Sequence, residues 1–354
     1  MSSTGLDLSL PYITEDLLGI GGMIRAKPED FLVEEVPLFE PSGEGDHLYV
    51  NITKMGATTR EVQEDIAGLF DIRYQDVGTA GLKDKDAIAT QTFSVYLEEN
   101  KLDTEYAAAL IEDHIGFRVN WTKYHNTKIR SGHLIGNKFK ILISDIKMQK
   151  RQIKERVDAI TERIHMHGIP NYYGDQRLGR RGKNVIAGWK ILNGEKRIGN
   201  KWLSRYLVSA YQSYICNRYL SERVNDGMFE KLVYGDVVSM HNNDAKFWVT
   251  DLRVDEELFQ HNELSFTVPM YGPDMMPAEG EAAILEERIF KESGLNMGQL
   301  RKHRVRGARR LGRLVPIIEV EQNNRGIQLT FTLGRGGFAT TVLREYQKHP
   351  KGVN

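Results

Sequence analysis

One turn of this chain carries a carboxylate in a setting that suits nucleophilic chemistry. It comprises residues 79–87 (TAGLKDKDA) and lies between two segments whose patterns predict ordered structure. Gly81 permits backbone angles that other residues avoid, and Lys83 and Lys85 place positive charge on both sides of Asp84. The turn can therefore present an ionised carboxylate, as a nucleophile or a base, to a polyanion. The alternative is a surface turn of alternating charge with no chemical role.

Basic side chains are concentrated in three windows, although the charge of the whole chain is balanced. The chain has 354 residues, with 48 Lys and Arg against 48 Asp and Glu. Residues 114–144, 177–205 and 301–313 together hold 22 of the basic residues and one of the acidic ones. Basic stripes of this kind are expected where a protein binds a phosphate backbone. Three solvated faces that do not meet in space are the alternative.

Several other chemistries lack their sequence signals. The single cysteine, Cys216, excludes a disulfide within the chain, and its apolar helical surroundings indicate a buried thiol. The zinc patterns C-x-x-C and H-E-x-x-H and the P-loop pattern do not occur. Asp84 and Asp86 could hold Mg²⁺ as in a nuclease, but alternate residues of a strand point to opposite faces and no third carboxylate is evident. No apolar run reaches the roughly 18 residues of a membrane span, so we expect a soluble, cytoplasmic protein.

Apolar spacing predicts an antiparallel or mixed sheet together with helices. Alternation predicts half-buried strands near residues 48–52, 139–143 and 327–333. Helical spacing predicts helices near residues 58–70, 153–164 and 201–224, the last with an apolar face that comprises Trp202, Tyr206, Ala210 and Ile215. Thr58 and Glu61 resemble a capping box at the start of the first helix. The strand that follows the basic run near Arg310 is expected to return to the first sheet, which makes the middle third of the chain an inserted domain.

Five motifs, in order, resemble those of the TruD family of pseudouridine synthases. They are residues 25–31 (RAKPEDF) with 41–47 (PSGEGDH), 80–85 (AGLKDK), 125–139 (from His125 to GNKF), 170–177 (PNYYGDQR) and 338–345 (FATTVLRE). These motifs extend over essentially the whole chain. The resemblance implies an α/β (α+β) fold, in which a pseudouridine synthase catalytic domain with a mixed, mainly antiparallel sheet is interrupted by an inserted α/β TRUD domain. On this basis we expect residues 1–168 and 313–354 to form the catalytic domain and residues 169–312 the insertion.

The resemblance also implies a reaction. Members of the family isomerise uridine to pseudouridine in tRNA, usually at position 13, without a cofactor or a metal. The N1–C1′ bond must break, the uracil must turn, and a C5–C1′ bond must form. A carboxylate can attack C1′ of the ribose, or C6 of the ring, and leave later. The sequence leaves both routes open.

Four site residues follow from the family motifs. Asp84 would be the nucleophile, and Arg25, where bacterial members often have Lys, would be its basic partner. A guanidinium stays charged and can bind a carboxylate through two hydrogen bonds. Phe139 would stack on the target base, and Asn137, on the same strand face, would contact it. By its pattern alone, Phe139 is typical of a core residue.

A larger set of basic and aromatic residues is predicted to bind RNA, in part from an RNA-facing surface between the two domains. The set comprises Lys83, Lys128, Arg130, Tyr173, Arg177, Arg180, Arg181, Lys183, Arg309 and Arg310, with Tyr172 beside Tyr173. The alternative for the middle of this set is a hinge stabilised by local acids such as Asp175. Arg344 and Glu345 are expected to pair structurally rather than to take part in catalysis.

Two other functions stay open at this point. One is a noncatalytic protein that binds structured RNA, and the other is a divalent-metal nuclease that uses Asp84 and Asp86. The favoured interpretation is an isomerase whose partner is tRNA, with no membrane association. We expect it to act as a monomer with no obligate protein partner.

Overall fold

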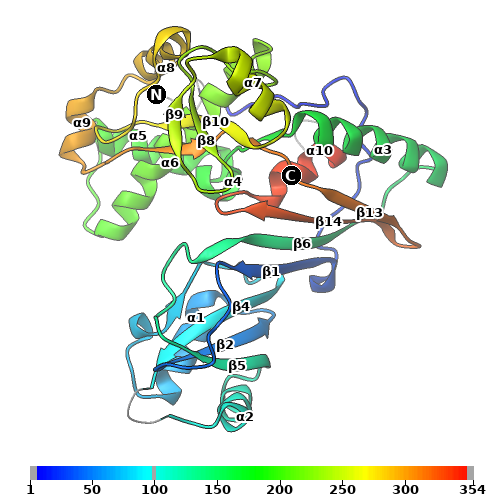
Figure 1. Ribbon diagram of the computed structural model, residues 1–354, viewed down its shortest axis with the longest axis vertical. Coiled ribbons are helices and arrows are strands. Elements are labelled where there is room, and N and C mark those ends of the chain that lie inside the picture. Colours follow the sequence, from blue (N-terminus) through cyan, green and yellow to red (C-terminus); the bar gives the residue numbers. More distant parts are fainter. Residues whose placement is uncertain (1–5, 98–100, 349–354) are drawn as a thin grey trace. The chain divides into compact units, whose positions relative to one another are not determined.

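The computed structural model describes residues 6–97 and 101–348, which form two compact units (Figure 1). The sheet unit comprises Ile20–Lys154 and Pro316–Gly337, and the helical unit comprises Met1–Gly19, Glu155–Val315 and Phe338–Asn354. Each unit therefore combines segments that are far apart in the sequence. Compact units and family domains need not share boundaries, so the division at residues 168 and 312 stays a prediction.

A mixed, mainly antiparallel sheet of eight strands forms the sheet unit. Its strands are ordered β13-β14-β6-β1-β4-β2-β5, and β3 pairs with β4 beside this path. The strands are β1 (Phe31–Pro37), β2 (His47–Lys54), β3 (Gly78–Thr79), β4 (Ile88–Tyr96), β5 (Arg118–His125), β6 (Leu134–Ser144), β13 (Ile318–Gln322) and β14 (Gly326–Gly334). β1 and β4 run parallel, and the other described pairs are antiparallel. The sheet type expected from the sequence is confirmed.

The last two strands of this sheet come from the end of the chain. β14 lies beside β6, from Gly326 opposite Ser144 to Gly334 opposite Gly136. β13 then pairs with β14. The prediction that the chain returns to the first sheet after the basic run near Arg310 is confirmed.

Two helices, α1 (Thr59–Leu69) and α2 (Thr104–Ile115), pack their apolar side chains into one core cluster with β2 and β4. α1 begins with the predicted capping box. The Thr58 hydroxyl accepts a hydrogen bond from the Glu61 N–H at 3.2 Å, and the Glu61 carboxylate accepts one from the Thr58 N–H at 2.6 Å. Burial of this cluster stabilises the fold of the sheet unit.

The helical unit consists of helices around two small sheets. Its helices are α3 (Lys150–His167, which starts in the sheet unit), α4 (Asp175–Leu178), α5 (Lys183–Leu192), α6 (Lys201–Asn225), α7 (Leu252–Gln260), α8 (Gly280–Glu292), α9 (Met297–Lys302) and α10 (Ala339–Gln347). One sheet is ordered β11-β10-β8-β9, and β12 pairs with β7 in the other. The strands are β7 (Ile169–Pro170), β8 (Val237–Met240), β9 (Lys246–Trp248), β10 (Leu264–Met270), β11 (Ala308–Leu311) and β12 (Arg313–Leu314). Within the described ranges, every helix is too short or too polar to cross a membrane.

The long helix α6 runs through the core of the helical unit. Gly188 of α5 passes it so closely that a Cβ at this position would lie 2.1 Å from the carbonyl oxygen of Leu207. Any other residue at position 188 would therefore push the two helices apart. Cys216 is buried in the same core, and burial raises the pKa of its thiol to about 11. The predicted structural thiol is confirmed.

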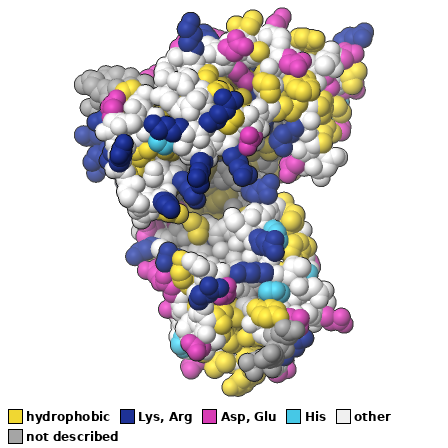
Figure 2. Space-filling view, turned by 90° about the vertical axis from the view of Figure 1, so that its left-hand side faces the viewer, with side chains coloured by type: hydrophobic (Ala, Val, Ile, Leu, Met, Phe, Trp, Pro, Cys, Tyr) yellow, Lys and Arg dark blue, Asp and Glu magenta, His cyan; other side chains and the backbone are white. Residues whose placement is uncertain are grey.

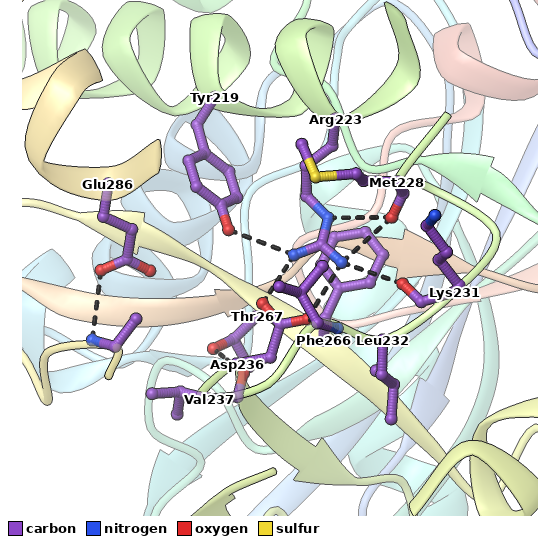
Figure 3. Close-up of polar contacts among 12 residues, drawn as sticks. Tyr219, Arg223, Met228, Lys231, Leu232, Asp236, Val237, Phe266, Thr267 and Glu286 are labelled. Carbon is purple, nitrogen blue, oxygen red and sulfur yellow. Dashed lines mark hydrogen bonds and ion pairs between the residues drawn. The ribbon is translucent and has the colours of Figure 1, made fainter. Parts of the chain in front are cut away.

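A buried ion pair ties α6 to the start of β8 (Figure 3). The guanidinium of Arg223 donates hydrogen bonds to both carboxylate oxygens of Asp236, at 2.6 and 3.0 Å. Its remaining N–H groups donate to the Tyr219 hydroxyl and to the carbonyls of Met228 and Lys231. Burial alone would lower the pKa of this guanidinium, but Asp236 and Tyr219 together more than offset burial, and the pKa is raised. The charge is therefore fully compensated inside the protein.

We predict that Asp236→Ala destabilises the helical unit strongly, because it leaves Arg223 buried without a counter-charge. The expected loss is about 3 to 5 kcal/mol in the free energy of unfolding, measured by urea denaturation followed by circular dichroism. Arg253→Ala, which breaks an exposed pair with Asp251, is the matched control and should change stability little. Equal stability of the two variants would contradict the account of the buried pair.

Candidate active site

Buried hydrogen bonds hold the turn before Asp84 in place. The turn follows β3 and leads into β4. The Gln91 side-chain amide of β4 donates to the carbonyl of Gly81 at 2.6 Å, and the Thr59 hydroxyl of α1 donates to the Gln91 side chain at 2.9 Å. The same Thr59 oxygen accepts a hydrogen bond from the N–H of Lys83 at 2.8 Å. A helix end and a strand therefore determine the backbone path up to the candidate nucleophile.

A buried ion pair fastens the same turn to β1. Lys83 Nζ lies 2.9 Å from Glu35 Oε2, and the two side chains are 6% and 3% exposed. In this low-dielectric position each charge needs the other, since an unpaired buried charge is expensive. Lys83 immediately precedes Asp84, so the pair restricts the position of the Asp84 backbone and therefore of its Cβ. Lys83 was expected to contact RNA, but its ammonium is enclosed and already bound to Glu35, which favours a positioning role instead.

Asp84 itself is accessible and forms an ion pair with Arg25. Arg25 Nη2 lies 3.4 Å from Asp84 Oδ2, and the side chains are 33% and 45% exposed. Arg25 has a φ of 59°, a left-handed conformation that few residues other than glycine adopt. Just before it, Met23 exchanges two backbone hydrogen bonds of 2.8 Å with Ser144 of β6. The sheet thus fixes the segment that directs the guanidinium to the carboxylate.

An aromatic cluster lies next to this ion pair. The Arg25 guanidinium carbon is 4.2 Å from the centre of the Phe31 ring. Phe31 meets Phe139 edge-on, with ring centres 6.5 Å apart, and Phe139 packs against Phe331 at 5.5 Å. Phe139 is 7% exposed, so its ring belongs to the packed cluster, as its alternating pattern alone indicates. Its stacking on a base stays a proposal.

Asn137 lies on the same face of the sheet as Phe139. It is opposite Glu35 in the register of β1 and β6, and Phe139 is opposite Val33. The side-chain oxygen of Asn137 is buried and has no hydrogen-bond partner among the described residues. A buried acceptor without a donor is costly, and a ligand with an N–H group would satisfy it. Asn137 therefore fits a contact to the edge of a base.

Two residues on or near the turn have properties that the sequence did not predict. Lys54, the last residue of β2, is buried and donates to the Ala57 carbonyl at 2.6 Å. Burial, and then the charge of Lys83, lowers the pKa of its ammonium, whereas Asp84 raises it. Leu82 is 81% exposed, so the turn presents an apolar side chain beside the carboxylate. Neither residue stands out from its neighbours by type or spacing.

The predicted RNA-binding residues divide between the two units. In the sheet unit, Arg130 is exposed, and Lys128 is half-buried and donates to the Gln75 carbonyl at 2.8 Å. In the helical unit, Arg180, Arg181 and Lys183 are exposed. Figure 2 shows many Lys and Arg side chains at the surface on the face that it presents. These five side chains are available, at least in part, to a polyanion.

Other members of the predicted set have internal partners. Arg309 is enclosed and pairs with Glu286 at 2.5 Å, while burial raises the pKa of that carboxyl and Arg309 opposes the rise. The guanidinium carbon of Arg310 lies 4.0 Å from the centre of the half-buried Tyr173 ring. Tyr172, expected at the RNA-facing surface, is buried in the core instead. Arg309 and Tyr172 thus support the fold and have little surface to offer to RNA.

Two further observations concern charged groups. Arg344 pairs with the buried Glu345 at 3.1 Å, as predicted, and the Thr14 hydroxyl donates to the same carboxylate at 2.7 Å.

Among residues 6–97 and 101–348, no three His, Cys, Asp or Glu side chains are grouped as a metal ion would require.

Comparisons with known proteins agree over nearly the whole chain. The family model described as "tRNA pseudouridine synthase D (TruD)" matches residues 7–198 and 199–346. A protein named tRNA pseudouridine synthase D from Thermus thermophilus is 39% identical over 340 residues, which cover 96% of this chain and 92% of that protein. One of the same name from Anaeromyxobacter sp. (strain Fw109-5) is 36% identical over 346 residues, with 96% of both chains covered.

The fold is also found in a crystal structure. It is that of a protein from Methanosarcina mazei that carries the family name TruD. The two structures superpose with a TM-score of 0.75 at 24% sequence identity, over 98% of this chain and 97% of the other. At this identity the match shows a shared fold.

We predict that Lys83→Met destabilises the sheet unit by about 3 to 5 kcal/mol, because it leaves the Glu35 carboxylate buried without a counter-charge. The double variant Glu35→Leu/Lys83→Met replaces the pair by apolar side chains and should recover most of this loss. The free energies of unfolding of both variants and of the wild type, measured in urea, test the prediction. A single variant as stable as the wild type would contradict it.

Proposed function

The chain belongs to the TruD family of tRNA pseudouridine synthases, and we propose that it isomerises uridine to pseudouridine at position 13 of tRNA, with Asp84 as the nucleophile. The enzyme is an isomerase. The observation that supports Asp84 is its setting, an accessible carboxylate paired with Arg25 on a turn that is otherwise fastened to the protein. A nucleophile needs to be accessible, so that it can reach the substrate, and it needs a fixed position, so that it stays aligned with the atom it attacks.

The four predicted site residues have complementary tasks in this proposal. Arg25 keeps the Asp84 carboxylate aimed, and it stabilises the negative charge that returns to the carboxylate when the carboxylate leaves. The side-chain oxygen of Asn137, which has no hydrogen-bond partner among the described residues, accepts a hydrogen bond from an N–H of the flipped uracil. Phe139 and its cluster provide the aromatic surface beside the base. Attack at C1′ and attack at C6 both fit this arrangement.

The supporting residues explain why the turn can serve as a catalytic platform. The Lys83–Glu35 pair and the Thr59–Gln91 hydrogen bonds are made before any substrate binds. The entropic cost of ordering the turn therefore arises during folding and does not add to the activation free energy of the reaction. Leu82 is exposed beside the carboxylate, where an apolar side chain suits the space that a flipped base leaves in its stack.

We assign binding of the tRNA backbone to the exposed and half-buried basic residues of the predicted set, which are Lys128, Arg130, Arg177, Arg180, Arg181, Lys183 and Arg310, with Tyr173 as an aromatic contact. Their charges would be partly neutralised by phosphates, so affinity should fall steeply with salt. The comparisons do not favour the two alternatives, a noncatalytic RNA-binding protein and a metal nuclease. We further propose that the enzyme acts as a monomer in the cytoplasm, where its substrate is found.

Asp84→Asn should abolish pseudouridine formation and leave tRNA affinity nearly unchanged, because the amide cannot act as a nucleophile and the phosphate contacts lie elsewhere. The product is measured by digesting the tRNA and separating its nucleosides, and affinity by filter binding. Asp86→Asn is the matched control on the same turn and should keep activity. Pseudouridine formed by Asp84→Asn at the wild-type rate would refute the assignment, as would equal losses in both variants.

Replacement of Arg25 should separate charge from geometry. Arg25→Lys retains a cation and should keep kcat within about tenfold of the wild type, whereas Arg25→Met should lower kcat by about 100-fold with little change in tRNA affinity. Single-turnover rates at saturating enzyme give the comparison. A rate for Arg25→Met equal to that of the wild type would mean that the ion pair with Asp84 has no part in the reaction.

A further inference from the structure

An exposed tryptophan lies at the start of the long helix of the helical unit. Trp202 is in the first turn of α6 and is 69% exposed, although the helical spacing of the sequence predicts it on an apolar, buried face. Its ring stacks flat on that of Tyr206, with ring centres 5.5 Å apart and planes 7° apart. One exposed apolar side chain needs no explanation, but an indole held parallel to a second ring offers a flat face on which another ring can stack.

Arginines and aromatic rings alternate behind this tryptophan. The guanidinium carbon of Arg177 lies 5.2 Å from the centre of the Tyr206 ring and 6.0 Å from that of Tyr173. Arg310 follows, 4.0 Å from the centre of the Tyr173 ring. The Tyr206 hydroxyl donates to the carbonyl of Gln176 at 3.0 Å, which fixes its ring. We call Trp202, Tyr206, Arg177, Tyr173 and Arg310 the stacking ladder.

The surroundings of Trp202 are basic. Lys196, Arg197, Lys201 and Arg205 are exposed, and within the described part of the chain none of them forms a salt bridge. The sequence contains no acidic residue from position 196 to position 221. The positive charge of these residues can attract an anion, and it surrounds the flat face of the Trp202 ring. A membrane surface would need a broader apolar area than Trp202 and its neighbour Leu203 provide.

We propose that the stacking ladder is a binding site for an unpaired nucleobase of RNA, with Trp202 as the outer platform and the four basic residues as contacts for the adjoining phosphates. Every base has a π face that can stack on an indole, and a base stacked on a protein aromatic is a general way to hold single-stranded RNA. The site belongs to the helical unit, whereas Asp84 belongs to the sheet unit. The reacting uracil is assigned to Phe139 and Asn137, so we assign the ladder to a different nucleotide of the RNA.

This site rests on the proposed function only for its natural ligand, which would be an unpaired nucleotide of the tRNA substrate. It gives the helical unit a means to recognise the fold of the RNA, since only nucleotides outside the base-paired stems can reach the indole. Loss of stacking should thus weaken substrate binding without altering the chemical step.

The test compares Trp202→Leu and Trp202→Phe with the control Ile284→Ala, an equally exposed apolar residue (68%) on α8. Binding of unmodified tRNA transcript is measured by filter binding over a range of salt concentrations. Trp202→Leu should weaken binding roughly 5- to 100-fold with an unchanged salt slope, because it removes a stack and no charge. Trp202→Phe should retain most of the affinity, and Ile284→Ala all of it.

A second measurement separates base stacking from charge. Wild-type protein should bind single-stranded oligouridylate more tightly than an abasic oligomer of the same length, and Trp202→Leu should lose this preference. Lys201→Gln/Arg205→Gln should lower the salt slope by about two and keep the preference for bases. Unchanged stability of Trp202→Leu in urea, expected for an exposed residue, completes the set.

The outcomes also distinguish this site from the reaction. If Trp202→Leu binds tRNA and oligouridylate as the wild type does, or binds more weakly only to anionic phosphatidylserine vesicles, the site is refuted even if pseudouridine forms. If Trp202→Leu raises KM and leaves kcat unchanged, the site is supported. If the wild type makes no pseudouridine but its RNA binding depends on Trp202, the proposed function fails and the site stands.

Discussion

The buried ion pair between Lys83 and Glu35 is the constraint on which the candidate site depends. The turn that carries Asp84 has no regular secondary structure, and such a segment would normally be mobile. Lys83 of this turn is buried because it pairs with the buried carboxylate of Glu35. Moving either side chain away would leave the other charge buried without a counter-charge, which is costly. The residue that follows is thereby held at the surface, within reach of Arg25.

The two units divide the work that the proposed function demands. The sheet unit contains a carboxylate, a guanidinium, an aromatic cluster, and an amide oxygen that accepts no hydrogen bond from the part of the chain that the structure describes. The helical unit presents exposed basic residues and aromatic rings interleaved with arginines. The two units are also stabilised differently. The eight-stranded sheet holds the sheet unit together, whereas the helical unit is built around α6, where Asp236 neutralises the buried charge of Arg223.

Local patterns predicted much of the fold, and the family motifs predicted the site. The capping box at Thr58, the strands and the long helices follow from spacing within short windows. The burial of Lys83 could not be predicted this way, because its partner Glu35 lies 48 positions earlier. The pairing of Arg309 with Glu286 could not be predicted for the same reason, since the two residues are 23 positions apart. Trp202 fits a helical apolar stripe by spacing, yet its place in the first turn leaves it exposed.

The most direct test of the central claim is to trap the adduct. Substitution of 5-fluorouridine at the target position of tRNA blocks loss of the C5 substituent after the C5–C1′ bond has formed. If the carboxylate attacks C6, the covalent adduct persists and can be located by mass spectrometry of the digested protein; if it attacks C1′, the carboxylate has already left and a rearranged fluoronucleoside remains in the RNA, where nucleoside analysis detects it. We predict that any adduct is on the peptide that contains Asp84, and that neither the adduct nor the rearranged nucleoside forms when residue 84 is asparagine. An adduct on another side chain, or one that persists in the asparagine variant, would contradict the account.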